Sequence, residues 1–167
     1  LHAMVLQPDT IGRDFAVAPN VDRRTKGGKE MWAEFEASAE GKTIVTTDIV
    51  EQAVAMRDKL MSNDYVRQLL DGEREKPFFW VDELTGEECK CRPDCITEYK
   101  GEKYIVDYKT TTSCANGHFE RACRTYGYKL QAAMYIEGVF ESTFEPYKFA
   151  FVAQEKTPPY AVRVYFC

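Results

Sequence analysis

The stretch CITEYKGEKYIVDYK, which ends at Lys109, constrains the fold more than any other part of this chain. Two β-rich runs around a glycine are typical of a tight β-hairpin. If Lys100 and Gly101 form a two-residue turn, Asp94 lies directly opposite Asp107. Any turn with an even number of residues keeps both carboxylates on one face, because side chains alternate with a period of two.

The hairpin pattern brings two acids and a lysine together. Ile105, Asp107 and Lys109 share one strand face, so Asp107 emerges from a largely apolar strand. Opposed Cβ atoms are about 4.5 to 5.5 Å apart, and two carboxylates at that distance repel unless a cation lies between them. Mg²⁺ is the natural candidate. An Asp-x-Lys pattern alone is weak, and the alternative is a salt-bridged hairpin in which Lys109 neutralises one aspartate.

A helix after the hairpin carries a second set of polar residues. Tyr128, Gln131 and Tyr135 follow i, i+3, i+7 spacing, so they share a helix face that can overlook the hairpin. The alternative is that the tyrosines are core residues. A polar amide between Leu130 and Ala132 needs partners, so Gln131 is the stronger candidate for contact with a phosphate or nucleotide.

Five sequence blocks, in order, resemble those of one nuclease family. The match extends over nearly all of the chain, and the blocks that carry it are LHAMVLQPD (1–9), DRRTKGGKEMWAEF (22–35), FFWVDELTGEECKCRPD (78–94), IVDYKTTTSC (105–114) and YGYKLQAAMY (126–135). In these blocks the chain resembles the RecE-like, or exodeoxyribonuclease VIII-like, branch of the PD-(D/E)XK nuclease superfamily, which is related to phage λ exonuclease.

The resemblance implies a metal site. Its ligands would be the side chains of His2, Glu75, Asp94 and Asp107 and the backbone carbonyl of Tyr108. His2 matches the active-site histidine of the family and would serve a second metal ion through a neutral imidazole. Glu73 is close enough to leave the assignment of Glu75 open. The cofactor implied is Mg²⁺, with Mn²⁺ as a substitute and one or two ions per site.

The resemblance also implies catalytic and DNA-binding roles. Lys109 matches the catalytic lysine, and Gln131 and Tyr135 match the glutamine and tyrosine of the helix after the hairpin. Separately, Arg23, Arg24 and Lys26 lie in a glycine-containing cationic run that suits binding of a phosphate backbone or a 5′-phosphate end. A solvated loop is an equally simple interpretation of that run.

The activity implied by the resemblance is Mg²⁺-dependent hydrolysis of DNA phosphodiesters. We expect degradation of linear double-stranded DNA, 5′→3′, which leaves 3′ tails for a single-strand annealing protein in recombination or repair. Relatives of this kind act as rings, so we expect a homo-oligomer, in the cytoplasm of a bacterium or phage-infected host. Alternatives are a structure-specific endonuclease, a Cas4-like nuclease, and an inactive module that binds DNA or a partner protein.

Bulk properties agree with this interpretation without deciding it. We expect residues 1–167 to form a single nuclease domain, because a chain of which 44% of the residues are hydrophobic can bury a sizeable core. We also expect this domain to be the ordered core of a longer chain. Neither a membrane span nor a signal peptide pattern is evident. The formal net charge of −5 is unusual for a DNA-binding protein, but a total count excludes neither a local basic track nor acids that a bound metal offsets.

Six cysteines suggest one alternative site. Cys89, Cys91 and Cys95 could form a zinc or iron–sulfur site, and one extended strand would place all three on one face. Their spacing differs from the usual Cys-x₂-Cys pairs. Buried free thiols in a reducing compartment are therefore the simpler expectation.

Periodicity and turn signals predict the remaining elements. We expect helices at 29–39, 48–61, 64–70 and 118–137, and strands at 77–83, 88–98, 103–111, 147–154 and 160–166. This order predicts an α/β fold with the restriction-endonuclease-like core, in which a mixed central β-sheet is flanked by α-helices.

Overall fold

The computed structural model describes all residues from 1 to 167 and divides into two compact units, Leu1–Asp58 and Lys59–Cys167. The single nuclease domain expected from the sequence stays a prediction, because compactness does not decide whether the two units fold together.

The first unit is mainly helical. Its elements are α1 (His2–Leu6), η1 (Pro8–Thr10), α2 (Ile11–Asp14), β1 (Phe15–Val17), α3 (Lys26–Ser38), β2 (Thr43–Val45) and most of α4 (Thr47–Met61). Strands β1 and β2 pair in parallel. The Thr25 hydroxyl caps α3 by accepting a hydrogen bond from the Gly28 amide. The helices predicted at 29–39 and 48–61 are thus confirmed as α3 and α4.

The second unit is built on a mixed sheet. It contains α5 (Asp64–Leu69), β3 (Glu73–Arg74), β4 (Phe78–Val81), β5 (Glu88–Cys91), β6 (Cys95–Tyr99), β7 (Glu102–Thr111), α6 (Asn116–Thr125), α7 (Tyr128–Thr143), β8 (Lys148–Glu155) and β9 (Val162–Phe166). Five strands form one sheet in the order β3-β6-β7-β8-β9, while β4 and β5 pair separately. Only β7 and β8 pair in parallel within the five-stranded sheet.

The β6–β7 hairpin has the register expected from the sequence. Tyr99 pairs with Glu102, and the two turn residues Lys100 and Gly101 both have positive φ, 52° and 77°. Positive φ at both turn positions is the type I′ geometry, whose twist matches that of the flanking strands. The predicted two-residue turn is confirmed.

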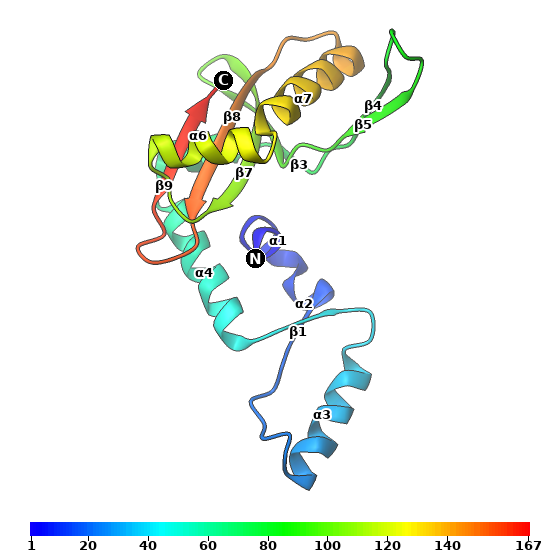
Figure 1. Cartoon of the computed structure of the whole chain (residues 1–167), viewed down its shortest axis with the longest axis vertical. Coiled ribbons are helices and arrows are strands. Elements are labelled where there is room, and N and C mark those ends of the chain that lie inside the picture. Colours follow the sequence, from blue (N-terminus) through cyan, green and yellow to red (C-terminus); the bar gives the residue numbers. More distant parts are fainter. The chain divides into compact units, whose positions relative to one another are not determined.

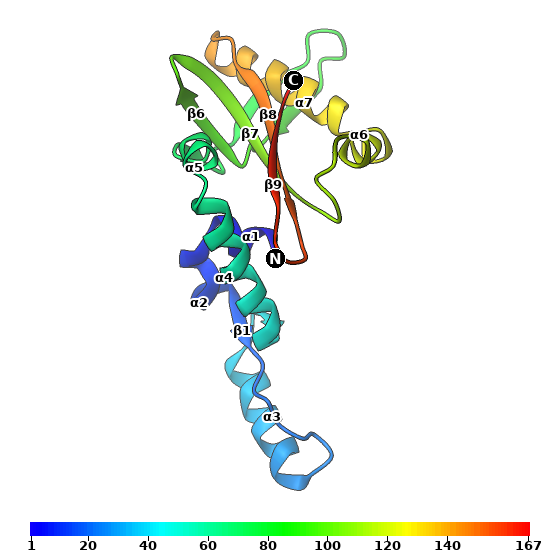
Figure 2. The same ribbon diagram turned by 90° about the vertical axis from the view of Figure 1, so that its left-hand side faces the viewer.

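Helices cover both faces of this sheet. Helices α6 and α7 lie over β7 and β8 (Figure 1), and α5 lies on the opposite side of the sheet from α6 (Figure 2). Beneath α6 and α7, an apolar core joins Ile105 of β7 and Phe149 and Phe151 of β8 to Phe119 and Val139 of the helices. Burial of each of these side chains contributes about 1.5 to 3 kcal/mol to the stability of the fold. The predicted α/β sheet with flanking helices is confirmed.

The β4–β5 hairpin projects beyond the sheet and is held by α7 (Figure 1). Phe78 and Trp80 are buried and alternate with the exposed Phe79 and Val81. The Trp80 ring lies so close to Gly138 of α7 that a Cβ atom there would be 2.3 Å from a ring carbon. A small residue is therefore required where the hairpin meets the helix.

The single strand predicted at 88–98 is wrong, because two strands occupy this range. Strand β5 pairs with β4, whereas β6 pairs with β3 and β7. Pro93 lies between the two strands; it has no amide hydrogen to donate, and its ring restricts the backbone of Arg92. The β-propensity of the flanking residues concealed this break.

The helix predicted at 118–137 is also two helices. Gly127, with φ of 68°, separates α6 from α7. A left-handed residue cannot continue a right-handed helix, so the chain changes direction at this glycine.

None of the helices is long and apolar enough to span a membrane.

Replacing Gly138 by alanine tests the contact between the hairpin and α7. Gly138→Ala places a methyl group against the Trp80 ring, so we expect a loss of about 1 to 3 kcal/mol in the free energy of unfolding. Gly117→Ala is the matched control, because nothing lies within 4 Å of an added Cβ on that helical glycine. Urea denaturation of both variants measures the difference; equal stability would contradict the packing described here.

Candidate active site

Asp107 is the most deeply buried acid of the candidate site. Its side chain is 4% exposed and projects from β7 toward Gln131 of α7. The Lys109 ammonium lies 2.6 Å from Oδ2, and the Gln131 amide nitrogen donates to Oδ1 at 2.7 Å. Both carboxylate oxygens thus have a partner, which makes burial of the charge tolerable.

The local structure explains this arrangement. Strand alternation puts Asp107 and Lys109 on one face of β7, and Phe151 of β8 lies beside Asp107 in the parallel pair. Helix α7 crosses this face and brings Gln131 over the carboxylate. The expectation that Gln131 overlooks the hairpin is confirmed as geometry.

Asp94 lies beside Asp107 on the neighbouring chain segment. Its Oδ2 accepts a hydrogen bond of 2.7 Å from the Tyr108 backbone amide. The β6–β7 register pairs Cys95 with Val106, so the next pair outward is Asp94 with Asp107. This hydrogen bond holds the side chain of Asp94 against β7 at Tyr108, the residue between Asp107 and Lys109.

The structure distinguishes the two upstream glutamates. Glu75 lies next to Asp94, because its amide donates to the Asp94 carbonyl at 3.4 Å, and its carboxylate accepts from Arg92 at 2.9 Å. Glu73 pairs instead with Lys76 and is 65% exposed. Glu75 therefore adjoins Asp94 through its backbone, whereas its carboxylate pairs with Arg92.

Tyr128 contributes to the position of Lys109. The Lys109 ammonium lies 4.8 Å from the centre of the Tyr128 ring, within cation–π range. Desolvation raises the pKa of the Tyr128 phenol, so the hydroxyl stays neutral near pH 7. Tyr128 also packs against Phe119 and Phe151, so it is a core residue as well as a wall of the site.

The donor set fits a hard divalent cation. Asp94 and Asp107 supply carboxylate oxygens from adjacent segments, and carboxylates are preferred ligands of Mg²⁺. No group of three or more His, Cys, Asp or Glu side chains is arranged around a common point. Mg²⁺ commonly needs only one or two carboxylates, with water and substrate phosphate completing its shell. The two aspartates match the number of carboxylates that a cation of this kind commonly uses.

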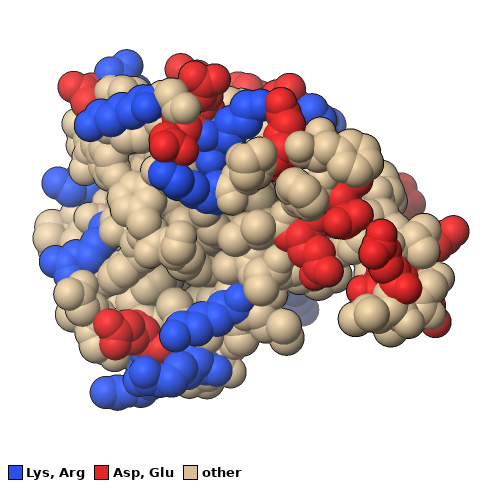
Figure 3. All heavy atoms as spheres, turned by 90° about the horizontal axis from the view of Figure 1, so that it is seen from above, with Lys and Arg blue, Asp and Glu red and all other residues tan.

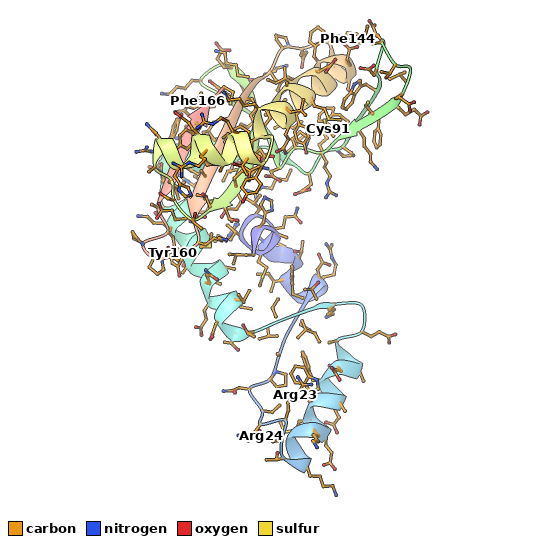
Figure 4. All side chains as sticks on the ribbon, viewed as in Figure 1. Arg23, Arg24, Cys91, Phe144, Tyr160 and Phe166 are labelled. Carbon is orange, nitrogen blue, oxygen red and sulfur yellow. The ribbon has the colours of Figure 1, made fainter.

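Four predicted site residues belong to the first unit. His2 begins α1, and Arg23 and Arg24 lie in the loop before α3, which Lys26 opens (Figure 4). The Arg23 guanidinium lies 4.1 Å from the Trp32 ring, and Arg24 pairs with Asp22 at 2.9 Å. Participation of these four residues in the site stays a prediction.

The cysteines form no thiolate cluster. Cys91 ends β5 (Figure 4) and Cys95 begins β6, so the single strand that would have aligned them does not exist. All six cysteines are free thiols. Burial raises the pKa of Cys91 and of Cys95 to about 11, so both thiols are neutral at pH 7. Neutral buried thiols in separate sheets agree with the simpler expectation.

Two residues beside the site have no role in the sequence-based prediction. Arg92 pairs with Glu75, and Phe79 exposes its ring near Tyr135 in a shared pocket. The alternation of Phe78, Phe79 and Trp80 is visible in the sequence and shows that Phe79 faces away from its neighbours. Only the packing of the hairpin on α7 reveals which face is exposed.

Comparison of the sequence with protein families decides the family. The model of a family described as "PDDEXK-like domain of unknown function (DUF3799)" matches residues 1–167. The chain belongs to this PDDEXK-like family. No curated protein sequence matches it. The assignment of Asp94, Asp107 and Lys109 to the active-site motif of that superfamily stays a prediction from the sequence.

Two solved structures are similar to this chain, and one of them supports the fold. The crystal structure of a protein described as a "putative exonuclease", from Eubacterium rectale, superposes with a TM-score of 0.60 at 18% identity and covers 87% of this chain. This chain spans only 55% of the length of that protein. The crystal structure of SSO0001 has a TM-score of 0.43 at 14% identity, covering 99% of this chain and 76% of the other. The Eubacterium rectale structure supports the nuclease fold.

Removing the Lys109 charge tests the buried pair. Lys109→Met leaves the Asp107 carboxylate without its ammonium partner, so we expect a loss of about 2 to 4 kcal/mol in unfolding free energy at pH 7 in EDTA. The double variant Asp107→Asn/Lys109→Met removes both charges and should lose less. Lys148→Met is the control, since its pair with Glu102 is half exposed and worth little. Urea denaturation compares the three, and equal losses in Lys109→Met and Lys148→Met would refute the buried pair.

Alkylation tests the description of the thiols. Cys167 is exposed and should react with iodoacetamide at pH 8, whereas Cys91, Cys95 and Cys114 should react only in denaturant. Burial holds the pKa of these three near 11. The unfolded chain loses its thiol protons near the ordinary cysteine pKa of about 8.5, whereas the native state keeps the protons of these three thiols up to about pH 11. The free energy of unfolding should therefore fall between pH 8.5 and 11. Peptide mass mapping identifies the modified residues; rapid native modification of Cys95 would contradict its burial.

Proposed function

We propose that this protein is a divalent-metal-dependent exodeoxyribonuclease that degrades linear double-stranded DNA. The observation that carries the proposal is the buried Asp107, held between Lys109 and Gln131 and adjacent to Asp94. A buried carboxylate next to a second one is costly, and a metal-dependent reaction gives it a purpose. The Eubacterium rectale protein of similar fold is described as a "putative exonuclease", which agrees with this proposal.

Asp94 and Asp107 would hold the cation in this proposal, with the Tyr108 carbonyl as a further ligand. When bound, a divalent cation lowers the pKa of water and neutralises negative charge on a phosphoryl group. Mg²⁺ is the proposed ion and Mn²⁺ its substitute. Glu75 adjoins Asp94 and would, with His2, serve a second ion.

Lys109 and Gln131 act beside the carboxylates. The Lys109 ammonium points to Asp107, from where it can orient a water molecule or donate to a non-bridging phosphate oxygen. Gln131 fixes the Asp107 carboxylate through its amide hydrogen, and Tyr128 limits the movement of Lys109. Hydrolysis then replaces one P–O ester bond by a bond to the water oxygen.

Direction and biological context extend the proposal. We propose 5′→3′ degradation that leaves 3′ tails for recombination or repair, with Tyr135, Arg23, Arg24 and Lys26 contacting the DNA. We also propose that the protein forms a ring-shaped homo-oligomer, has a single-strand annealing protein as a partner, and is located in the cytoplasm of a bacterium or phage-infected host. The resemblance to RecE-like enzymes supports these finer features.

Digestion of end-labelled DNA tests the function. Linear duplex labelled at the 5′ or the 3′ end is incubated with Mg²⁺, and in parallel with EDTA, beside a closed-circular control. We expect metal-dependent early release of the 5′ label as mononucleotide, with the circle intact. Cleavage of the circle would indicate an endonuclease instead, and failure to cut any DNA would indicate a DNA-binding or partner-binding module.

Replacing the buried acid tests the assigned chemistry. Asp107→Asn keeps the shape of the side chain but removes its charge, so we expect a loss of Mg²⁺-dependent cleavage of at least about 100-fold. Glu102→Gln is the matched control, since Glu102 lies on the same strand but is exposed and pairs with Lys148. Thermal melting shows that both variants fold. Retention of most activity by Asp107→Asn would remove Asp107 from the mechanism.

A further inference from the structure

A pocket of about 510 Å³ opens at the base of the β4–β5 hairpin. It is lined by Pro77, Phe79, Lys90, Cys91, Arg92 and Tyr135. Its volume lies within the range of about 300 to 1,000 Å³ that is usual for small-ligand sites. The lining combines the aromatic rings of Phe79 and Tyr135 with the cationic side chains of Lys90 and Arg92.

The pocket adjoins the catalytic centre on two sides. Tyr135 follows Gln131 by four residues on α7, so the two share one helix face. Arg92 precedes Asp94 by two residues, and its guanidinium pairs with Glu75, which adjoins Asp94. A substrate strand with its scissile phosphate at Asp94 and Asp107 would therefore extend into this pocket.

The exposed ring of Phe79 is the distinctive feature of the lining. Phe79 is 67% exposed although Phe78 and Trp80, its neighbours on β4, are buried. Lys90 lies directly opposite Phe79 in the β4–β5 register, and both residues line the pocket. Tyr135 is half-buried, and its ring packs against that of Phe149. A ligand that stacks on the exposed ring would remove its apolar surface from water.

Charge along the hairpin favours a nucleic acid at its base. The acids Asp82, Glu83, Glu87 and Glu88 lie in the distal half, and acidic side chains gather on the projecting lobe at the right of Figure 3. Lys90 and Arg92 lie at the base, next to the pocket. A phosphate chain is repelled from the tip and attracted to the base.

We infer that this pocket binds an unpaired base of the DNA strand, next to the nucleotide being cleaved. Phe79 and Tyr135 stack on the base, and Lys90 and Arg92 contact the flanking phosphates. Single-strand sites combine aromatic stacking with cationic side chains in this way, and only an unstacked base offers its ring face to a side chain. The inference rests on the proposed function and adds a single-stranded segment to it.

Binding of a single-stranded oligonucleotide tests the inference. Fluorescence anisotropy with a labelled oligothymidylate of about ten nucleotides is measured for Phe79→Ala in the Asp107→Asn background. We expect affinity to fall about 5- to 100-fold, because loss of one stacking contact has effects of that size. Phe79→Trp should restore binding. Val81→Ala is the control: Val81 is an exposed residue on the same face of β4 that does not line the pocket, so affinity should not change.

A second variant reports on the phosphate contact. Lys90→Gln should weaken binding and reduce the dependence of affinity on salt concentration, since one phosphate contact is lost. Melting curves show whether each variant is folded. Equal affinity of Phe79→Ala and Val81→Ala for the oligonucleotide would overturn the inference. A change in the oligomeric state of Phe79→Ala would also overturn it, because that result would assign the Phe79 ring to a protein interface.

The inference and the proposed function fail in different assays. Cleavage of linear DNA by the unmodified protein, with Phe79→Ala binding the oligonucleotide normally, would refute the base-binding pocket alone. Absence of cleavage, with Phe79-dependent oligonucleotide binding, would refute the nuclease proposal alone.

Discussion

The Asp107 carboxylate lies almost out of contact with water, and the arrangement of the second unit around it satisfies that charge. Lys109 comes from the same strand, Gln131 from a helix more than twenty residues later, and Asp94 from the segment before the hairpin. Each partner depends on a different feature of the fold: strand alternation, the crossing of α7 over the sheet, and the hairpin register. A shift of one residue in that register would move Asp107 to the opposite face of the sheet.

The type I′ turn is what holds the register in place. Lys100 and Gly101 both adopt positive φ, and only a two-residue connection of this kind aligns β6 and β7 as observed. The same turn places the Tyr108 amide where it can donate to Asp94. A feature at the far end of the hairpin thus fixes the acids at its base.

The region around the catalytic centre divides into a rigid part and an accessible part. Phe119, Phe149 and Phe151 form the packed floor beneath α6 and α7, and they hold Tyr128 and Tyr135 in place. The β4–β5 hairpin adds an exposed ring and two cations beside this floor. The hairpin pocket follows from the pairing of β4 with β5 and from the position of Tyr135 on α7.

The sequence by itself determined the local features: the turn at Lys100 and Gly101, the shared face of Asp107 and Lys109, and the helix face that carries Gln131 and Tyr135. Periodicity and turn chemistry act over a few residues, so they can be read directly. The tertiary structure decided that β5 and β6 belong to different sheets, that Gly127 divides the last helical region, and that Glu75 rather than Glu73 adjoins Asp94. These outcomes depend on which distant segments pack together, and local propensity carries no information about that choice.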